Sequence, residues 1–336
     1  MTSPDSIDPD LVPGRALSSG VALPAIGLGT FGSDHVPHQR VADAVVSGVR
    51  LGYRHIDCAS VYGNESHIGR ALSTLQDDGF ERDDLWVSSK LWNDSHDNVG
   101  DSCRRTLDDL GLDHLDMYLV HWPFPNYHPP HCDVETRSPD AKPYDHDKFA
   151  ATWQQMEALV EEGLVRHIGT SNMTVAKLDV LLTSTRIAPS VNQMELHPHF
   201  QQPELLGYLG ERRIQPIGFC PLGSPARPER DTTPDDTEPM SDPVVTGIAA
   251  DHGVHPSAVC LRWAVQRGHI PIPFSTDPGH QLANLRAVTE LALAEHEMTQ
   301  LMGIDRRCRL IKGQVFLWRE GQSWEDLWDV DGVIAR

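Results

Sequence analysis

Short apolar runs alternate with longer amphipathic stretches along most of the chain. His55–Asp57, Leu85–Lys90 and Met117–His121 are runs with the length and character of strands. Between them, Glu65–Leu75 and Val99–Leu110 carry apolar residues at the spacing of a helix face. Strands that alternate with helices in this way predict an α/β fold, in which parallel strands are joined by right-handed crossovers.

The alternation extends far enough for eight strands. Gly27–Phe31 is the expected first strand and Ile270–Phe274 the last, while Ala16–Ile26 predicts a short β-hairpin that plugs the lower end of a barrel. The other expected strands are Val165–Gly169, Val191–Glu195 and Gln215–Phe219, and the other expected helices are Gln39–Leu51, Phe149–Glu162, Val175–Leu182, Pro203–Arg212, Pro243–His252, Pro256–Gln266 and Gln281–Ala287.

Strands and helices that alternate in this way can form an open doubly wound sheet or a closed barrel. The open doubly wound sheet would want a glycine-rich phosphate turn that opens a helix directly after an early strand. A closed barrel needs about 250 residues plus insertions, which this chain supplies. We therefore predict a (β/α)8 TIM barrel over residues 15–310, preceded by a loose leader at residues 1–14.

Two long insertions and a tail decorate the predicted barrel. The insertions, Phe124–Lys148 and Pro221–Asp242, each follow a strand, so on a barrel they lie at the rim where the carboxyl ends of the strands meet. The tail, residues 311–336, interleaves acids with aromatic residues such as Phe316, Trp318, Trp324 and Trp328. We expect the tail either to pack over a pocket at this rim or to dock on the surface through its own aromatic side chains.

Three successive strand ends carry residues that could act together. Asp57, Lys90 and His121 end the strands, and Tyr62 lies on the loop after Asp57. A tyrosine that donates a proton near pH 7 needs a nearby cation to lower its pKa from about 10, and that cation needs an anion to hold it. We therefore assign Tyr62 as a general acid and Lys90 as its cation. Asp57 anchors Lys90, and His121 orients a carbonyl oxygen. Each residue alone would more often be structural, so the prediction depends on all four meeting at one rim.

Seven motifs occur in a fixed order along the chain: GLGTF, YRHIDCASVYGNE, SSKLW, YLVHWP, IGTSN, VNQMELHP and PLGSP. Together they resemble the aldo-keto reductases, of the aldose reductase and xylose reductase type, from about Arg15 to about Leu310. The resemblance implies an oxidoreductase that transfers a hydride between a nicotinamide cofactor, NAD(P)H, and a carbonyl or alcohol substrate: an aldehyde, aldose, keto-sugar or polyol. It implies the same roles for the four rim residues, with the tyrosinate of Tyr62 as the base in alcohol oxidation.

The resemblance also assigns residues to the cofactor and the substrate. Ser171, Asn172 and Gln193 would grip the carboxamide, although the first two could also cap the next helix. Phe219 would stack on the ring, where the family usually has Tyr, because stacking needs only the π face. The expected cofactor residues are Gly29, Thr30, Phe31, Asp57, Ser171, Asn172, Gln193, Phe219, Leu222, Ser224, Phe274, Ser275, Thr276, His280 and Asn284, and the expected substrate residues are Phe31, Val61, Tyr62, Trp92, His121 and Trp122.

The segment after the last predicted strand bears on which dinucleotide is used. Family members that prefer NADPH carry a Lys and an Arg that clamp the 2′-phosphate and a Glu that holds the adenine, whereas this chain has Phe274, His280 and Ala283 there. Ser275-Thr276 is a weak replacement for the charge-assisted bonds that a phosphate needs. The resemblance therefore favours NAD(H), or dual use, over strict NADPH dependence. Arg286 is the residue most able to restore phosphate binding.

The loop Pro221–Asp242 is expected to close loosely over the pyrophosphate, to which Leu222 and Ser224 would offer polar groups. In tightly closing members of the family, an Asp of this loop pairs with two lysines. Ala226, Gly32 and Phe274 occupy those three places here. Loss of the pairs would speed cofactor release.

Composition narrows the partners and the location. The 48 acidic residues outnumber 28 basic ones and give a net charge of −20, which argues against nucleic acid and anionic membranes as partners. The six cysteines are scattered, as is usual for reduced thiols, and neither a secretory signal nor a membrane span is evident. We expect a cytoplasmic protein that acts on a small molecule, with a monomer as the default state.

Two other classes of function stay open. A barrel can serve as a binding or regulatory subunit, although the presence of all four rim residues argues against a catalytically silent one. The segment HPPHC offers His128, His131 and Cys132 to a metal-dependent hydrolase. Its prolines and the lack of a fourth nearby ligand disfavour zinc, so no metal site is predicted.

Overall fold

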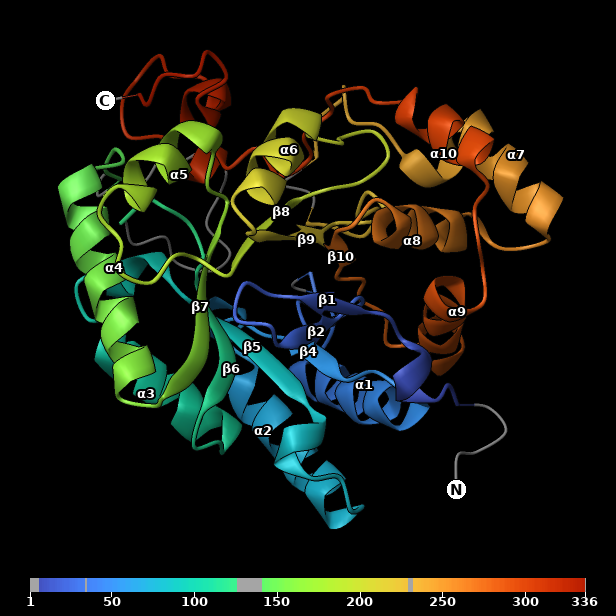
Figure 1. Ribbon diagram of the computed structural model, residues 1–336, viewed down its shortest axis with the longest axis horizontal. Coiled ribbons are helices and arrows are strands. Elements are labelled where there is room, and N and C mark those ends of the chain that lie inside the picture. Colours follow the sequence, from blue (N-terminus) through green and yellow to red (C-terminus); the bar gives the residue numbers. More distant parts are fainter. Residues whose placement is uncertain (1–5, 34, 126–140, 229–231, 336) are drawn as a thin grey trace.

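Eight parallel strands follow one another around a barrel in chain order, with helices on the outside (Figure 1). This computed structural model describes residues 6–33, 35–125, 141–228 and 232–335. The strands are β3 (Leu28–Gly29), β4 (His55–Asp57), β5 (Trp86–Leu91), β6 (Leu115–Val120), β7 (Val165–Ser171), β8 (Val191–Glu195), β9 (Gln215–Phe219) and β10 (Ile270–Pro271). Backbone hydrogen bonds from Gly27 N to Pro271 O (3.0 Å) and from Gly29 N to Pro273 O (2.9 Å) join the first strand to the last. The predicted (β/α)8 barrel is confirmed.

The helices pack their apolar faces against the strands. Within the described ranges they are α1 (His38–Leu51), α2 (Glu65–Asp77), α3 (Val99–Leu110), α4 (His146–Glu161), α5 (Val175–Leu182), α6 (Pro203–Glu211), α7 (Pro243–His252), α8 (Pro256–Gln266), α9 (Pro278–Thr289) and α10 (Glu295–Met302). In α4, Asp145 caps the N-terminus by accepting a hydrogen bond from Lys148 N (3.2 Å). Phe149, Trp153 and Met156 recur at helical spacing and are buried.

A hairpin closes the lower end of the barrel, as predicted. It consists of β1 (Gly14–Ala16) and β2 (Ala22–Pro24), which pair antiparallel. Leu17 and Leu23 from this hairpin belong to one buried cluster with strand residues such as Met117 and Ile270. The interior below the rim is therefore filled with side chains, and any ligand must bind at the opposite, carboxyl end of the strands.

The N-terminal leader is packed where a loose segment was predicted. Ile7 N donates to Leu51 O (2.8 Å), and the Ile7 side chain is buried. Pro9–Leu11 forms a 3₁₀ turn capped by Asp8. From Ile7 onwards the predicted loose leader is therefore packed on the barrel, through the buried Ile7 side chain, its backbone bond to Leu51 and the capped turn.

Element ends differ from the prediction more than element positions do. The expected strands Gly27–Phe31 and Ile270–Phe274 shrink to β3 and β10, although backbone bonds continue past both. Helix α10 was not predicted at all. Its first turn is acidic, and Ala294 N is capped by Glu297 (2.6 Å), but its apolar stripe is short.

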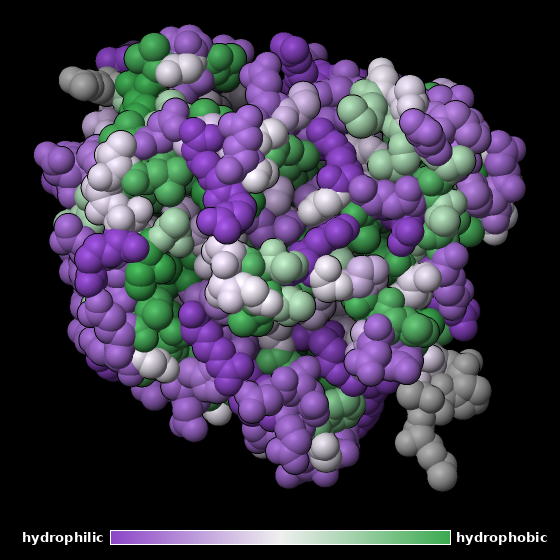
Figure 2. Space-filling view, viewed as in Figure 1, coloured by the Kyte–Doolittle hydropathy of each residue, from purple (hydrophilic) through white to green (hydrophobic). Residues whose placement is uncertain are grey.

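The outer surface is predominantly hydrophilic. Figure 2 shows polar side chains over most of the visible face, with small hydrophobic patches between them. None of the described helices is long and apolar enough to cross a bilayer. The residues described also contain no group of three or more side chains arranged to hold a metal ion. The HPPHC segment lies outside the described residues.

Candidate active site

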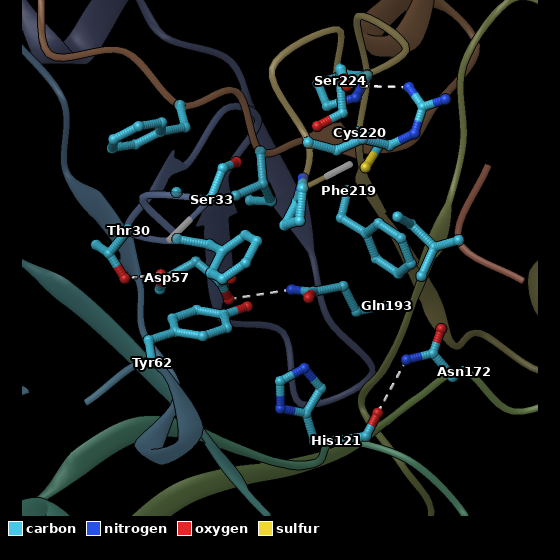
Figure 3. Close-up of a pocket in the computed structure, with 18 of the residues that line it drawn as sticks. Thr30, Ser33, Asp57, Tyr62, His121, Asn172, Gln193, Phe219, Cys220 and Ser224 are labelled. Carbon is cyan, nitrogen blue, oxygen red and sulfur yellow. Dashed lines mark hydrogen bonds between the residues drawn. The ribbon is translucent and has the colours of Figure 1, made fainter. Parts of the chain in front are cut away.

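A cavity of about 460 Å³ opens at the carboxyl ends of the strands (Figure 3). Its lining comes from the strand ends, from the loops that follow them and from residues of the C-terminal segment 311–316. The residues predicted from the sequence that line it are Gly29, Thr30, Phe31, Asp57, Val61, Tyr62, Trp92, His121, Trp122, Asn172, Gln193, Phe219, Leu222, Ser224 and Phe274. The predicted nicotinamide and substrate residues therefore surround one space.

A buried ion pair lies at the base of this cavity. Lys90 Nζ is 2.6 Å from Asp57 Oδ2, and the side chain of Lys90 has no exposed surface. Nζ also donates to Cys58 O (2.8 Å), and Gln193 Nε2 donates to the second carboxylate oxygen of Asp57 (3.0 Å). Each charge thus has a charged partner and further hydrogen bonds, which is the condition for keeping an ion pair out of water.

Tyr62 lies directly above the ion pair. It ends a 3₁₀ turn, Ser60–Tyr62, after which Gly63 takes the left-handed conformation (φ 65°) that lets the chain turn into α2. Lys90 Nζ is 5.3 Å from the centroid of the Tyr62 ring. His121 meets the same ring edge-on at 5.9 Å, and Phe31 packs at 5.1 Å. Figure 3 shows Tyr62, Asp57 and Gln193 converging, with His121 facing them.

The protonation states follow from burial and from Lys90. Burial raises the pKa of Tyr62, and the positive charge of Lys90 acts in the lowering direction. Burial also disfavours the charge on Lys90, but Asp57 and Tyr62 outweigh it and raise the pKa of the amine. Burial together with Lys90 brings the pKa of His121 well below its usual value, so its imidazole is neutral at pH 7.

Two polar atoms of His121 and its neighbour Asn172 have no protein partner among the described residues. They are His121 Nδ1 and Asn172 Oδ1, both buried. The backbone of His121 is fixed from two sides, because its N–H donates to Leu91 O (3.1 Å) and its carbonyl accepts from Asn172 Nδ2 (3.0 Å). Buried polar atoms that lack a partner usually meet a ligand or water, so this corner of the cavity is suited to a polar group.

The predicted carboxamide site fits a nicotinamide. Asn172 Oδ1 is an acceptor without a partner, and a carboxamide offers N–H donors. Gly29 also lines the cavity, and a Cβ there would lie 3.2 Å from Ile272 Cγ2. Phe219 lines the same part of the cavity and presents an aromatic side chain. Ser171 does not line the cavity. Its hydroxyl donates to Gln193 O (3.0 Å) and accepts from Asn172 Nδ2 (3.2 Å), so it holds the wall in place.

The far wall of the cavity is aromatic. Phe316 from the C-terminal tail packs on Trp122 with ring centroids 4.6 Å apart, and on Trp92 at 6.1 Å. Trp328 backs Trp122 from behind at 5.5 Å. The tail therefore contributes to this wall, and Gly313, Gln314, Val315 and Phe316 all line the cavity.

Known proteins resemble this chain along nearly its whole length. The family model described as Aldo/keto reductase family matches residues 25–306. The chain belongs to this family.

Two relatives and one solved structure support the assignment. The aldo/keto reductase slr0942 of Synechocystis sp. is 40% identical over 318 residues, which cover 93% of this chain and 95% of the relative. Aldo-keto reductase family 1 member A1 of Bos taurus is 39% identical over 304 residues, 88% of this chain and 90% of the relative. The crystal structure of the Bombyx mori aldo-keto reductase AKR2E4 in complex with NADP matches with a TM-score of 0.80 at 29% identity, over 91% of this chain and 96% of that one. As an aldo/keto reductase, the protein is a nicotinamide-dependent oxidoreductase of carbonyl and alcohol groups.

Besides Ser171, four of the predicted cofactor residues do not line the cavity of this reductase. Ser275, Thr276, His280 and Asn284 lie beyond its edge, between β10 and α9 or on α9 itself. Asp277 caps α9 by accepting a hydrogen bond from His280 N (3.0 Å), and that bond lowers the pKa of Asp277. A carboxylate therefore occupies the first turn of the helix that follows β10.

The reductase also has residues at the cavity that the sequence did not single out. They include Ser33, Cys220, Arg227, Met240 and Ile311. Arg227 is the only one with a permanent charge, and its Nη2 is paired with Asp236. Nothing in the periodicity marks these positions, because they lie in irregular loops where no pattern relates sequence to orientation.

Proposed function

We propose that this aldo/keto reductase reduces carbonyl groups with Tyr62 as the proton donor. The observation that carries the proposal is the buried Lys90–Asp57 ion pair beside the Tyr62 ring, at the base of the cavity. Perturbed ionisable groups that meet in a cavity are frequent at catalytic sites. A bound nicotinamide supplies the hydride in reduction and accepts it in oxidation.

The roles of the four rim residues follow from their positions. Tyr62 gives its hydroxyl proton to the substrate oxygen, and Lys90 stabilises the negative charge that remains on the phenolate. Asp57 keeps the ammonium of Lys90 charged and in place. Neutral His121 offers a hydrogen bond to the same substrate oxygen and so orients the carbonyl.

The direction of the reaction depends on the protonation of Tyr62. Because burial raises its pKa against the opposing effect of Lys90, the phenol stays protonated at neutral pH. Reduction needs the phenol, and oxidation needs the phenolate. We therefore expect reduction to dominate near pH 7 and alcohol oxidation to accelerate as the pH rises. A catalytically silent barrel is disfavoured because the whole proton-transfer group is assembled.

Apolar substrates suit the aromatic wall better than free sugars do. Trp92, Trp122 and Phe316 present ring faces, and Ile311 and Val315 add aliphatic surface. A sugar would leave several hydroxyl groups against these surfaces without partners, at a cost of about 1–3 kcal/mol for each buried one. Aldehydes with an aryl or alkyl group are the substrate class that we propose over aldoses and polyols.

NAD(H), or dual use, is proposed over strict dependence on NADPH. Phe274 and His280 replace the cations that would clamp a 2′-phosphate, and Asp277 holds a negative charge at the start of α9. Arg286 is half exposed and lies 3.9 Å from Glu290, so its charge is already partly neutralised. One missing charge-assisted bond costs about 1.5–3 kcal/mol, or roughly ten- to a hundredfold in affinity.

Absorbance of the reduced cofactor tests both parts of the proposal. The assay compares kcat/KM for NADH and NADPH with aryl aldehydes, alkyl aldehydes, aldoses and polyols. We expect turnover with the aldehydes and at least equal use of NADH. A tenfold or greater preference for NADPH would refute the cofactor assignment, and Arg286→Ala would then show whether that side chain is responsible. Absence of nicotinamide binding would refute the function itself.

A further inference from the structure

One carboxylate connects the two loops that flank the cavity. Asp236 lies in the loop between β9 and α7 and accepts hydrogen bonds from Arg227 Nη2, from Thr233 N (2.8 Å) and from Thr233 Oγ1 (2.7 Å). Lys312 Nζ, from the C-terminal segment, lies 3.3 Å from Asp236 Oδ1 and also donates to Thr233 Oγ1. The side chains of Arg227 and Asp236 are each only 8% exposed, so solvent screens this cluster weakly.

Arg227 fixes the part of the loop that lines the cofactor end of the cavity. Its Nη1 donates to Gly223 O (3.3 Å) and to Ser224 O (3.2 Å), the turn that the sequence assigns to the pyrophosphate. Ser224 itself has a left-handed backbone (φ 44°), which a non-glycine residue adopts only when its surroundings hold it there. The position of this turn therefore depends on the guanidinium, and the guanidinium is held by Asp236.

Lys312 belongs to the opposite wall. Its neighbours Ile311 and Gly313 line the cavity, and its carbonyl accepts a hydrogen bond from Trp328 Nε1 (2.8 Å). A Cβ at Gly313 would lie 3.2 Å from the ring of Trp122, so the backbone here packs directly on the aromatic wall. The backbone of Lys312 is thus part of the substrate side, and its side chain extends to the cofactor loop.

Other hydrogen bonds hold the bases of the loop and of the C-terminal segment. Glu195, at the end of β8, accepts from Leu310 N (2.7 Å) and Ile311 N (2.8 Å) and so holds the start of the C-terminal segment. Asp242, at the end of the loop, accepts from Arg306 Nη2 (2.7 Å) and lies 3.0 Å from His199 Nε2. These bonds hold the start of the C-terminal segment and the end of the loop. Neither set joins the cavity-lining part of the loop to the cavity-lining part of the C-terminal segment.

We propose that Asp236 is a positioning residue that couples the cofactor loop to the substrate wall, through Arg227 on one side and Lys312 on the other. Ordering of the loop on the dinucleotide then also orders the wall that contacts the carbonyl substrate. The kinetic consequence rests on the proposed function. The mechanical coupling does not, because it is a property of the protein without any ligand.

Amide hydrogen exchange of the cofactor-free protein tests the mechanical coupling. Asp236→Asn preserves the shape of the side chain and keeps one oxygen that can accept from Thr233, but removes the charge. Lys312→Met leaves the loop and its Arg227–Asp236 pair untouched. We expect Asp236→Asn to speed exchange about tenfold at Phe316 and Leu317, and Lys312→Met to do the same at Gly223 and Arg227, in line with the loss of one charge-assisted bond.

Internal references make this result decisive. The N–H groups of Leu310 and Ile311 are held by Glu195 and should exchange in both variants as they do in the wild type. A third variant, Asp78→Asn, is the matched control, because Asp78 pairs with Arg50 on the remote surface. All of its amides should exchange at the wild-type rate. If each variant changed exchange only in its own segment, the coupling would be refuted. General loss of protection, including Leu310 and Ile311, would mean that Asp236 stabilises the fold as a whole and would also refute it.

Kinetics then test the consequence for the reaction. In Asp236→Asn we expect about a tenfold rise in both the cofactor Kd and the substrate KM, with kcat changed less than threefold, because no group that touches the substrate is altered. Lys312→Met should raise the cofactor Kd although it lies in the substrate wall. An unchanged cofactor Kd in Lys312→Met would overturn the kinetic coupling. Lack of any turnover by the wild-type protein would count against the proposed function, and the exchange result would stand independently.

Discussion

A buried ion pair contributes to holding the C-terminal tail on the barrel, and breaking it should open the aromatic wall. Lys177 Nζ lies 2.5 Å from Asp329 Oδ2, and both side chains are 1% exposed. Lys177 also donates to Leu327 O (3.0 Å), and Asp329 accepts from Thr174 Oγ1. The perturbation that we choose is Asp329→Asn, because asparagine tolerates the left-handed backbone of this residue (φ 49°) and removes only the charge.

The size of the effect follows from the burial of the pair. Removal of one partner from a buried ion pair typically costs about 3–5 kcal/mol, since the other charge stays in place without compensation. Burial already lowers the pKa of Lys177 against the opposing effect of Asp329, so the amine can lose its proton, and the asparagine can still accept one hydrogen bond. We therefore expect the lower end of the range, about 3 kcal/mol, which is roughly a hundredfold in the opening equilibrium.

When the tail leaves the barrel, Lys177 becomes solvated and most of the cost of its unpaired charge is avoided. Amide hydrogen exchange detects this undocking of the tail. Amide exchange at Phe316 and Leu317 should accelerate by about a hundredfold. The KM for an aryl aldehyde should rise because Phe316 and Trp328 leave Trp122. Glu325→Gln is the matched control. It removes a negative charge from the same tail, and the contact of this carboxylate with Ser323 is exposed.

A second variant separates the charge from the contact. Lys177→Met combined with Asp329→Asn removes both charges and should recover more than half of the lost protection, because a buried ion pair can be replaced by apolar groups at little cost. Wild-type exchange and KM in Asp329→Asn would refute the anchor. A double variant no better than the single one would refute the explanation by an uncompensated lysine.

The other predictions concern the rim and the buried histidines. Tyr62→Phe should lower turnover by about 10²–10⁴-fold with cofactor affinity nearly unchanged, and a variant that kept half of the wild-type rate would exclude Tyr62 as the acid. Lys90→Met should move the alkaline limb of the pH profile upward, because the cation that opposes the raised pKa of Tyr62 is gone; an unshifted profile contradicts the coupling. Burial lowers the pKa of His55 and of His96 to about 4, whereas unfolding restores it to about 6.5. Between pH 4 and pH 6.5 the unfolded chain therefore binds more protons than the folded one. The contribution of each histidine to the free energy of unfolding is fully present above pH 6.5 and falls by up to about 1.4 kcal/mol per pH unit towards pH 4. Equal free energies of unfolding in urea at pH 7.5 and at pH 5.0 would refute this.

The barrel and the rim could be predicted because both depend on short-range pattern. A strand such as β5 is buried on both faces and therefore appears as a continuous run, and its last residues must point to the rim. That rule locates Asp57, Lys90 and His121 at the rim from the sequence alone. The ends of β3 and β10 were misplaced because their continuation depends on bonds across the closure of the barrel, between residues more than 240 positions apart.

The residues predicted to bind the adenosine part of the cofactor differ from those of the rim. Ser275, Thr276 and His280 were assigned by resemblance alone, and they lie outside the cavity formed by the described residues. Ser275 and Thr276 lie in the connection between β10 and α9, and His280 lies in the first turn of α9. Their assignment to the cofactor therefore still depends on the resemblance.

The loop Pro221–Asp242 contains charge pairs other than the clasp that the resemblance led us to look for. Gly32, Ala226 and Phe274 carry no clasp, whereas Asp236 pairs with Arg227 and with Lys312 in the described part of the loop. Lys312 lies 76 positions away from Asp236, in a segment with no assigned place in the barrel. An ion pair needs only two opposite charges brought within about 4 Å, and in an irregular loop the sequence does not specify which of its many acids that will be. The loss of one set of pairs is therefore evidence about those positions alone, and the closure of the loop depends on where the tail docks.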